Sequence, residues 1–387
     1  MKATILLILV STLILPLNIQ ETTPPKLFPI TLEGKQGYID GSGKIVIQPR
    51  FDNAWEFSEG LAPVSIGDNW GYIDQTGTVV IMPLFFEVMP FQEGLAVVGA
   101  YFKSGPINNR VGNYGYIDKT GKFVIPPQFS VAFDFSDGLA KILTEDSKHG
   151  YVDKSGKVAF YRKDPFSEKF SNGLALFTTH GNMPDSKTGY LDRAGKIASS
   201  PKFDGGEGFS DGLACVYLNK KAGFIDTKGK IAIDFRFDRC RSFSEGLAAV
   251  MIDDKWGYID KLGRIVIDPK FAEAEQFSDD VAVVRVIQDS EPPENEERYK
   301  EGPNIISIKT GNYGVVDRND MMILPARFVQ LHNFSNGLAF VNLGENYIVH
   351  GNVDRWGYID KSGKFVWRSF VDDNRSLSNA HFIGASR

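Results

Sequence analysis

Short apolar stretches alternate with polar turn residues at a regular spacing over most of this chain. In one representative stretch, Leu61–Ser65 predicts a strand, Trp70–Ile73 a second strand, and Val79–Ile81 a third. Asp74–Gly77 separates the last two as a tight turn. No apolar run keeps the helical period over a useful length, so the sequence predicts an all-β protein.

Two short signatures repeat along the chain. The first is Gly-aromatic-aliphatic-Asp, and the second is Phe-Ser-acid/Asn-Gly-Leu-Ala with two variants. The first signature or its variant begins at Gly37, Gly71, Gly115, Gly150, Gly189, Gly223, Gly257, Gly314 and Gly357. From each of the first eight to the glycine position of the second signature the distance is always 23 residues, whereas the return distance varies from 11 to 34. Fixed spacing indicates packed structure, and variable spacing indicates surface loops.

Each unit also contains its own turn and core residues. Asp stands three residues after the motif glycine in all nine copies, and a second Gly stands six after it in eight. Asp accepts backbone hydrogen bonds in such a turn, and Gly adopts the positive φ that closes it. Paired phenylalanines such as Phe51 and Phe57 are expected to enter the core. The stretch Leu27–Leu32 can serve as the first strand of unit one, which then needs no strand from the C-terminus.

These residues carry a family resemblance. Trp70–Asp74, Lys255–Asp260 and Arg355–Lys364 resemble the WG (KWG) repeat of bacterial proteins, and the second signature matches that family as well. The resemblance implies a β-rich tandem repeat, often exported or surface-associated, to which no catalytic residues are assigned. Nine units then span residues 34–382, with a tail at 383–387. Unit four departs from the pattern at Tyr161–Asp164, and unit nine has a degenerate second half at Phe370–Phe382.

The arrangement of the nine units is less constrained than their number. Propellers usually have four to eight blades of four strands, whereas this chain has nine units with three evident strands each. We therefore expect an open or superhelical β-repeat array. A closed β-propeller-like ring is the alternative, and a choline-binding-type hairpin solenoid is a third arrangement.

The N-terminus has the pattern of an export signal. Lys2 precedes the apolar run Ala3–Leu17, which is too short to span a bilayer comfortably, so residues 1–20 are predicted to be a signal peptide. Pro16–Gln20 lacks an A-x-A cleavage motif, which leaves an N-terminal anchor as an alternative and a buried strand as another. Residues 21–33 lead into unit one with the N-terminal strand. We expect a secreted, periplasmic or cell-surface protein with no transmembrane domain beyond this signal.

Composition narrows the function further. The 387 residues are 42% hydrophobic, enough for a large core, and the net charge of −5 argues against nucleic-acid partners. Two cysteines exclude a disulfide-built scaffold. Cys240 stands in a column occupied by Ala in other units, which favours a buried thiol, while export would permit a disulfide between Cys215 and Cys240.

No catalytic, metal or cofactor site is predicted. The acids recur in every unit and are therefore interpreted as turn residues, and the five histidines share no spacing. An aromatic residue precedes the motif glycine in five units, where it could contact a ligand or pack between units. This aromatic column consists of Trp70, Tyr114, Trp256, Tyr313 and Trp356. Residues 288–303 form an acidic insertion, interpreted as flexible and solvated or as a docking segment for a basic partner.

The sequence therefore favours an exported, non-catalytic binding or interaction scaffold whose partner is a protein or a cell-envelope glycan. The alternative is an envelope or extracellular enzyme acting on glycans, or a lectin-like carbohydrate-binding protein. The long loops Val97–Tyr114, Ile287–Tyr313 and Val341–Trp356 occupy the same connection of their units and are expected on one loop-rich face, the usual binding side of repeat proteins. The oligomeric state is left open by the sequence.

Overall fold

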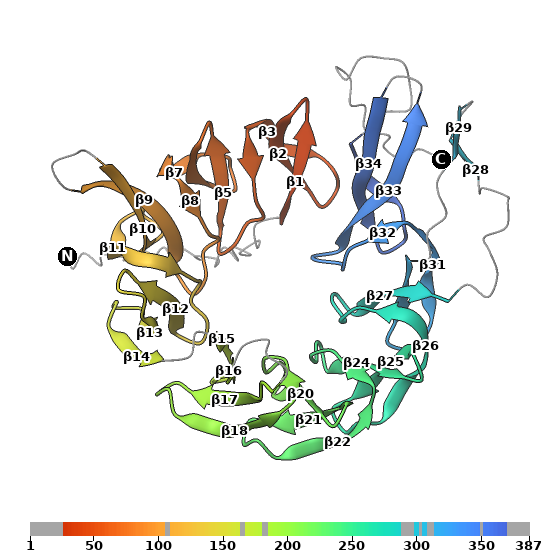
Figure 1. The fold of residues 1–387 in the computed structure, drawn as a ribbon. Helices are drawn as coiled ribbons and strands as arrows, with labels where there is room; N and C mark the ends of the chain where they lie inside the picture. The colour runs from red at the N-terminus through yellow and green to blue at the C-terminus, as the bar shows by residue number, and fades with distance from the viewer. Residues whose placement is uncertain are drawn as a thin grey trace, which may run out of the picture.

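The protein is an all-β ring of blades, as seen in a computed structural model that describes residues 26–104, 109–162, 167–179, 185–287, 298–301, 304–307, 313–348 and 351–369. Every strand pairing is antiparallel, and the described residues contain no helix, so none could cross a membrane as one. Nine blades, numbered here in chain order, follow one another around the ring (Figure 1). The predicted all-β array of nine units is confirmed.

The strands of each blade are consecutive in the chain. Blade 1 contains β1 (Leu27–Leu32), β2 (Lys35–Asp40) and β3 (Ile45–Phe51). Blade 2 contains β4 (Asn53–Ala54), β5 (Leu61–Ile66), β6 (Asn69–Asp74) and β7 (Val79–Phe85). Blade 3 contains β8 (Glu87–Val88), β9 (Ala96–Ser104), β10 (Asn109–Ile117) and the start of β11 (Phe123–Ala132). Blade 4 contains the end of β11, β12 (Leu139–Thr144), β13 (His149–Asp153) and β14 (Val158–Arg162). Blade 5 contains β15 (Ser167–Ser171), β16 (Leu174–Thr178), β17 (Thr188–Asp192) and β18 (Ile197–Phe203). Blade 6 contains β19 (Gly205–Gly206), β20 (Leu213–Leu218), β21 (Lys221–Asp226) and β22 (Ile231–Phe237).

Blades 7 to 9 complete the ring. Blade 7 contains β23 (Arg239–Cys240), β24 (Leu247–Ile252), β25 (Lys255–Asp260) and the start of β26 (Ile265–Ala274). Blade 8 contains the end of β26, β27 (Val281–Val286), β30 (Tyr313–Asp317) and β31 (Met322–Phe328). Blade 9 contains β32 (Gln330–Leu331), β33 (Leu338–Ile348), β34 (Gly351–Asp360) and β35 (Phe365–Arg368). The insertion of blade 8 adds the hairpin of β28 (Arg298–Glu301) and β29 (Asn304–Ser307).

Most blades have one strand more than the three that the sequence predicted. The extra strand is short, such as β8 in blade 3, and lies nearest the hole of the ring, whereas the fourth strand lies at the rim (Figure 1). Two residues are too few to show a period of two, which is why the pattern did not reveal it. Blade 1 differs, because β1 pairs with β2 as β5 pairs with β6. The strand expected at Leu27–Leu32 is thus present at the predicted position, as the first of the three longer strands, and no innermost strand precedes it within the described residues.

The glycines of the repeat have two separate physical roles. Gly77 has a φ of +85° and its N–H donates to the Asp74 carbonyl at 2.9 Å, so it closes the predicted tight turn. The motif glycine Gly257 is required by space instead. A Cβ at this position would lie 2.5 Å from the carbonyl oxygen of Ile267, on the neighbouring strand, where the pairing is shifted by a bulge.

The core lies between successive blades rather than within them. Tyr72 of blade 2 is fully buried, packs its ring against Phe91 of blade 3 at 4.9 Å, and donates its hydroxyl to the Met89 carbonyl at 2.7 Å. Burial raises the pKa of Tyr72, so the hydroxyl remains a donor at physiological pH. The paired phenylalanines enter these cores as predicted, since Phe51 is buried and Phe57 packs in the same cluster.

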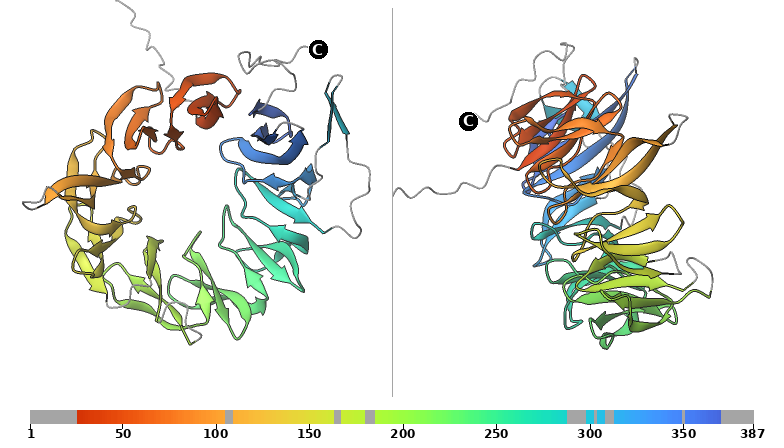
Figure 2. Two further views of the ribbon diagram at one scale, coloured as in Figure 1. Left: turned by 45° about the horizontal axis from the view of Figure 1, so that its top comes forward. Right: turned by 90° about the vertical axis from the view of Figure 1, so that its left-hand side faces the viewer.

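The first and last blades meet. Phe28 of blade 1 contacts Tyr358 of blade 9 with 5.5 Å between ring centres, and both belong to a core that spans the join. No hydrogen-bonded strand crosses this join within the described part of the chain. The array therefore has the ring-like form that the sequence left as its alternative (Figure 2). The predicted signal at 1–20, residues 288–297 and 302–303 of the insertion, Phe370–Phe382 and the tail at 383–387 lie outside the described residues.

Candidate interaction surface

The two ends of the blades form two different faces of the ring. One end, called the turn face here, contains the Phe-Ser-acid-Gly loops and the Asp-x-x-Gly turns, because Leu61 at the start of β5 pairs with Asp74 at the end of β6. The other end, called the hairpin face, contains the connections between the second and third strands. In blade 2 the connection has two residues, and in blades 3 and 9 it joins the long strand pairs β9–β10 and β33–β34, which extend to the same side of the ring in Figure 2.

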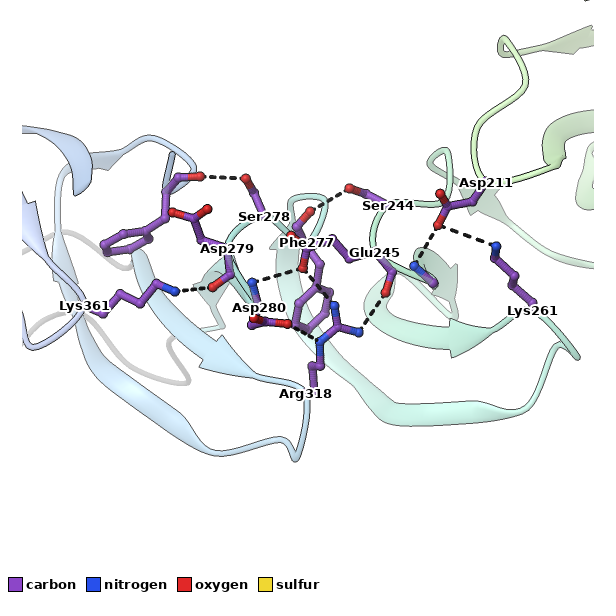
Figure 3. Close-up of polar contacts among 12 residues, drawn as sticks. Asp211, Ser244, Glu245, Lys261, Phe277, Ser278, Asp279, Asp280, Arg318 and Lys361 are labelled. Carbon is purple, nitrogen blue, oxygen red and sulfur yellow. Dashed lines mark hydrogen bonds and ion pairs between the residues drawn. The ribbon is translucent and has the colours of Figure 1, made fainter. Parts of the chain in front are cut away.

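The turn face is covered by a polar belt that repeats from blade to blade (Figure 3). The Glu245 carboxylate of blade 7 accepts the backbone N–H of Asp280 in blade 8 at 3.0 Å, and Ser244 Oγ donates to the Phe277 carbonyl at 2.7 Å. The same acid-to-amide bond joins Glu59 to Gly94, Glu93 to Gly138, Asp137 to Gly173, Asp211 to Gly246 and Asp279 to Gly337. These repeated acids are therefore acceptors in the joints between blades.

At several joints, a lysine or arginine of the next blade also donates to the loop of the preceding blade. Arg318 of blade 8 donates through Nη1 to the Glu245 carbonyl and through Nη2 to its carboxylate, both at 2.8 Å, and through Nε to Asp280 at 3.1 Å (Figure 3). Lys361 donates to the Asp279 carbonyl in the same way. The cations of these joints are thus bonded to the loop of the preceding blade.

The turn aspartates are equally engaged. Asp74 Oδ1 accepts from Thr76 Oγ1 at 2.6 Å, from Thr76 N at 2.9 Å and from Thr78 N at 3.0 Å. The Thr76 hydroxyl, together with these backbone donors, lowers the pKa of Asp74 below its ordinary value. In the described residues, no three His, Cys, Asp or Glu side chains lie close enough together to hold a metal ion.

The aromatic column lies at the hairpin end of the third strands, partly inside the cores between blades. Trp256 is only 7% exposed, and the Arg241 guanidinium lies 5.4 Å from its ring. Trp70, Tyr114, Tyr313 and Trp356 are partly buried. Their contacts are Trp70 on Trp55, Tyr114 to Glu87, Tyr313 to Glu273 and Trp356 on Trp367. These contacts leave Trp256 little surface for a ligand, and the ligand role of the column stays a prediction.

A second set of residues, which the sequence analysis missed, lies near the hole of the ring. It consists of the residue two before each phenylalanine of the second signature, at the innermost strand, and is called the inner row. In chain order the inner row is Trp55, Met89, Phe133, Glu168, Glu207, Arg241, Glu275 and His332. Blades 2 to 4 thus have apolar side chains here, and blades 5 to 8 have charged ones. The sequence could have revealed this row through its constant distance of two residues from the phenylalanine of the second signature. That the row lies near the hole follows only from the arrangement of the blades.

Exposed aromatic side chains are concentrated on blades 2 to 4. Trp55 is 38% exposed, Phe133 50% and Tyr101 52%. Tyr101 stacks on Phe86 at 4.7 Å, and Phe86 contacts Tyr114 at 5.7 Å. Together with Trp70 these residues form what is called the aromatic stretch here: Trp55, Trp70, Phe86, Tyr101, Tyr114 and Phe133. Single exposed apolar residues are ordinary, whereas a series on three consecutive blades distinguishes this part of the ring from the rest.

Blade 4, where the sequence departs from the repeat, carries a shallow pocket of about 560 Å³. It is lined by Ser147, Lys148, His149, Tyr161 and Arg162. Burial and the nearby Lys141 ammonium lower the pKa of His149, which keeps this imidazole neutral at physiological pH. Lys148 is paired with Asp146 at 2.7 Å.

The two cysteines join neighbouring blades. Cys215 of β20 and Cys240 of β23 form a disulfide in the structure, with their Cα atoms 6.0 Å apart and both side chains buried. Blades 6 and 7 are thereby linked covalently at the alanine column noted in the sequence. The bond lies in the core of the joint, far in sequence from the aromatic stretch.

A family model and one solved structure agree with this architecture. A family model described as "WG containing repeat" matches residues 37–70, 70–99, 114–146, 189–221, 223–256, 256–286 and 313–347, which is more than half of the chain. A crystal structure of a eukaryotic initiation factor is similar over 90% of this chain and 96% of that one, with 11% identity and a TM-score of 0.58. BamB from Moraxella catarrhalis aligns over 89% and 96%, with 11% identity and a TM-score of 0.35. Among curated proteins, none matches significantly.

Proposed function

Because the chain belongs to the family of WG containing repeats, we propose that it is an exported, non-catalytic scaffold that binds a partner through its hairpin face. The family and the ring of blades support a repeat protein for interaction. The finer parts of the proposal are the face used, the chemistry of the contact and the compartment. Each rests on particular residues.

The observation that carries the proposal is the contrast between the two faces. On the turn face the repeated acids, amides and cations bond to one another across the joints, as Glu245, Asp280 and Arg318 do. On the hairpin face the connections differ in length from blade to blade and Tyr101 is exposed, while Trp55 and Phe133 are exposed at the inner edge of blades 2 and 4. Variation in length and exposed rings are what a binding surface on a repeat scaffold requires.

The aromatic stretch suits a partner with flat apolar faces. Trp55 and Trp70 pack against each other at 5.1 Å, which fixes the orientation of the exposed Trp55 ring before a ligand arrives. Rings held in this way stack on sugar faces or on apolar side chains at low entropic cost. The partner we propose is a cell-envelope glycan or a protein segment, and a lectin-like protein would use the same stretch.

Export is supported by two independent features. Lys2 and the apolar run Ala3–Leu17 have the pattern of a signal peptide. The disulfide between Cys215 and Cys240 fits an oxidising compartment. Cell fractionation with N-terminal sequencing tests this part, and we expect an extracytoplasmic chain that begins near residue 20. Cytoplasmic protein with an intact Met1 would contradict it.

Binding without catalysis is tested by one paired assay. Purified protein is incubated with insoluble cell-envelope glycan and, separately, with immobilised envelope proteins, and both retention and release of soluble sugar are measured. We expect retention on one of these materials and no sugar release. Release of sugar would instead support the alternative of a glycan-acting enzyme.

Matched variants locate the contact. Trp55→Ala with Phe133→Ala removes two exposed rings of the aromatic stretch, and Leu262→Ala removes a 73% exposed side chain from the turn face. We expect the double variant to lose retention and Leu262→Ala to keep it. Equal retention of both would show that the aromatic stretch is not the binding site.

A further inference from the structure

Within the described residues, blade 1 has no innermost strand like that of the other blades. In blade 2 the Trp55 N–H of the inner row donates to the Pro63 carbonyl of β5 at 3.0 Å. The same bond is made by Met89 to Val97, Phe133 to Lys141, Glu207 to Cys215, Arg241 to Ala249, Glu275 to Val283 and His332 to Phe340. The equivalent carbonyl of β1 belongs to Pro29. It accepts the Tyr358 hydroxyl at 3.1 Å, and among the described residues no inner-strand N–H donates to it.

Tyr358 is also the exception among the motif tyrosines. Six of them donate to the carbonyl of the residue 17 positions later: Tyr38, Tyr72, Tyr116, Tyr151, Tyr190 and Tyr258. Seventeen residues after Tyr358 stands Arg375, which lies outside the described part of the chain. The tyrosine and the carbonyl that bond to each other here are therefore the two groups whose usual partners would come from residues near 375.

The sequence around residue 375 carries the pattern of an innermost strand and its loop. Leu377-Ser378-Asn379-Ala380 resembles Phe334-Ser335-Asn336-Gly337 of blade 9. Ser378 follows the turn glycine Gly363 by 15 residues, the spacing that separates Gly43 from Ser58. The residues before β1 do not fit, because Thr23-Pro24-Pro25-Lys26 stands at the signature position and proline has no N–H to donate.

We propose that residues 372–379 dock on the inner edge of β1 as the missing innermost strand of blade 1 and so close the ring. The register follows from blade 2, where Asn53 lies opposite Ser65 and Ala54 opposite Val64. It places Asp373 opposite Thr31 and Asn374 opposite Ile30. The Arg375 N–H then donates to the Pro29 carbonyl, and the Arg375 carbonyl accepts the Tyr358 hydroxyl.

The same register completes the polar belt across the join. Asn336 of blade 9 has the position of the acids that accept a backbone N–H from the next blade, and in the structure its Oδ1 accepts the Lys26 ammonium. With the segment docked, Ala380 supplies the amide at that place. Asn379 becomes the acceptor that faces the Gly60 amide of blade 2. Leu377 takes the place against Tyr358 that Phe91 has against Tyr72.

An engineered disulfide tests the register in the full chain. In blade 2 the side chains of Asn53 and Ser65 meet, with 2.9 Å between Nδ2 and Oγ, so the pair Thr31→Cys and Asp373→Cys is placed to form a disulfide. The control pair, Thr31→Cys and Asp372→Cys, shifts the second cysteine by one residue and so to the opposite side of the strand. Both variants keep Cys215 and Cys240 and are oxidised with oxidised glutathione.

Peptide mapping under non-reducing conditions by mass spectrometry gives the outcome. We expect the 31–373 disulfide to form at least about ten-fold faster than the 31–372 disulfide, because strand pairing fixes which side chains face each other. Equal rates, or no 31–373 disulfide at all, would overturn the proposal. The result is independent of whether the hairpin face binds a partner.

A single substitution adds a readout of stability. Leu377→Asp places a charge against the Tyr358 ring and should lower the Tm by about 5 °C, whereas Leu377→Phe restores the residue of the signature and should keep or raise it. A Tm that Leu377→Asp leaves unchanged would also overturn the proposal. If Leu377→Asp does not fold, the cysteine pair still decides the question, because it leaves Leu377 in place.

Discussion

The turn face and the hairpin face are built from the same repeat, yet only the turn face keeps its side-chain pattern around the ring. At the joint of blades 7 and 8, Ser244, Glu245 and Arg318 all bond to the neighbouring blade or its loop. Because each loop bonds to the next, a change in one loop disturbs two blades. Repetition on this face is therefore a requirement of packing.

The hairpin face shows what happens when that requirement is relaxed. Between blades 1 and 2, where the hairpin is tight, Asp52 bonds to Lys35 at 2.5 Å and to the Gly67 amide at 2.7 Å. Asp204 and Asp238 make the same bonds at their joints. In blade 3, where the hairpin is long, Phe86 replaces this aspartate and stacks on Tyr101. The longer connection thus exchanges a structural ion pair for aromatic surface.

The largest contrast we expect is between a buried and an exposed aromatic residue. Trp256→Ala should lower the free energy of unfolding by about 3–5 kcal/mol, because its ring is packed between blades 7 and 8. Phe133→Ala should change it by less than about 0.5 kcal/mol, because half of its side chain is exposed. Urea denaturation measures both. A stable Trp256→Ala protein that no longer binds its partner would restore the aromatic column as the ligand site.

Next in size is the covalent link between blades 6 and 7. Replacing Cys215 and Cys240 by Ala should lower the free energy of unfolding by about 2–4 kcal/mol, since the bond limits the unfolded chain. Thermal unfolding with and without reductant, together with a thiol count on the denatured wild type, provides the check. Two reactive thiols and a Tm insensitive to reductant would contradict the disulfide.

Substitutions at two glycines distinguish a glycine that is required for lack of space from one that is required for its backbone conformation. Gly257→Ala should cost about 2–3 kcal/mol, because the new Cβ meets the Ile267 carbonyl at 2.5 Å. Gly246→Ala should cost about 1 kcal/mol, because its φ of +82° is unfavourable but no other atom lies within 4 Å of the new Cβ. Urea denaturation of the two variants gives the ranking. Losses of equal size would mean that the bulge at Gly257 can adjust.

The smallest effect we expect is the pH dependence of the Tm, which arises from the turn aspartates of the turn face. Hydrogen bonds from Thr120 and Ser155 lower the pKa of Asp118 and Asp153 in the folded protein. A carboxylate with a lowered folded pKa contributes stability that is present above its unfolded pKa of about 4 and is lost as the pH falls further. The Tm should therefore decline below about pH 4, and less steeply in Asp118→Asn. Calorimetry across pH 3–7 tests it, and parallel curves would contradict the role of Asp118.

Much of the fold could be predicted from the sequence because the repeat spacing records packing. The three longer strands, the Asp74–Gly77 type of turn and the burial of Phe51 followed from period, turn chemistry and fixed distances. The short inner strand was missed, because two residues such as Asn53 and Ala54 have no recognisable period. Ring closure was left open because it depends on a small rotation between blades that no single residue encodes.

The candidate surface was predicted less well for the same reason. The β9–β10 and β33–β34 connections could be assigned to one face from the chain order alone, whereas most of the connection from Ile287 to Tyr313 lies outside the described residues. Which aromatic side chains remain exposed there depends on the neighbouring blade, which buries Trp256 but leaves Trp55 and Phe133 accessible. The inner row has a constant offset from the second signature, but its place near the hole follows only from the arrangement of the blades around the ring.

The division between the two faces is tested most directly by hydrogen exchange on the full chain, with and without the envelope material that retains it. We predict that bound partner slows exchange in the amides of the β9–β10 hairpin, on the hairpin face, and of the inner strands β4 and β8 beside the aromatic stretch. Exchange in the loops around Glu245 and Asp279 should not change. Protection confined to those turn-face loops, with none on blades 2 to 4, would contradict the assignment of binding to the hairpin face.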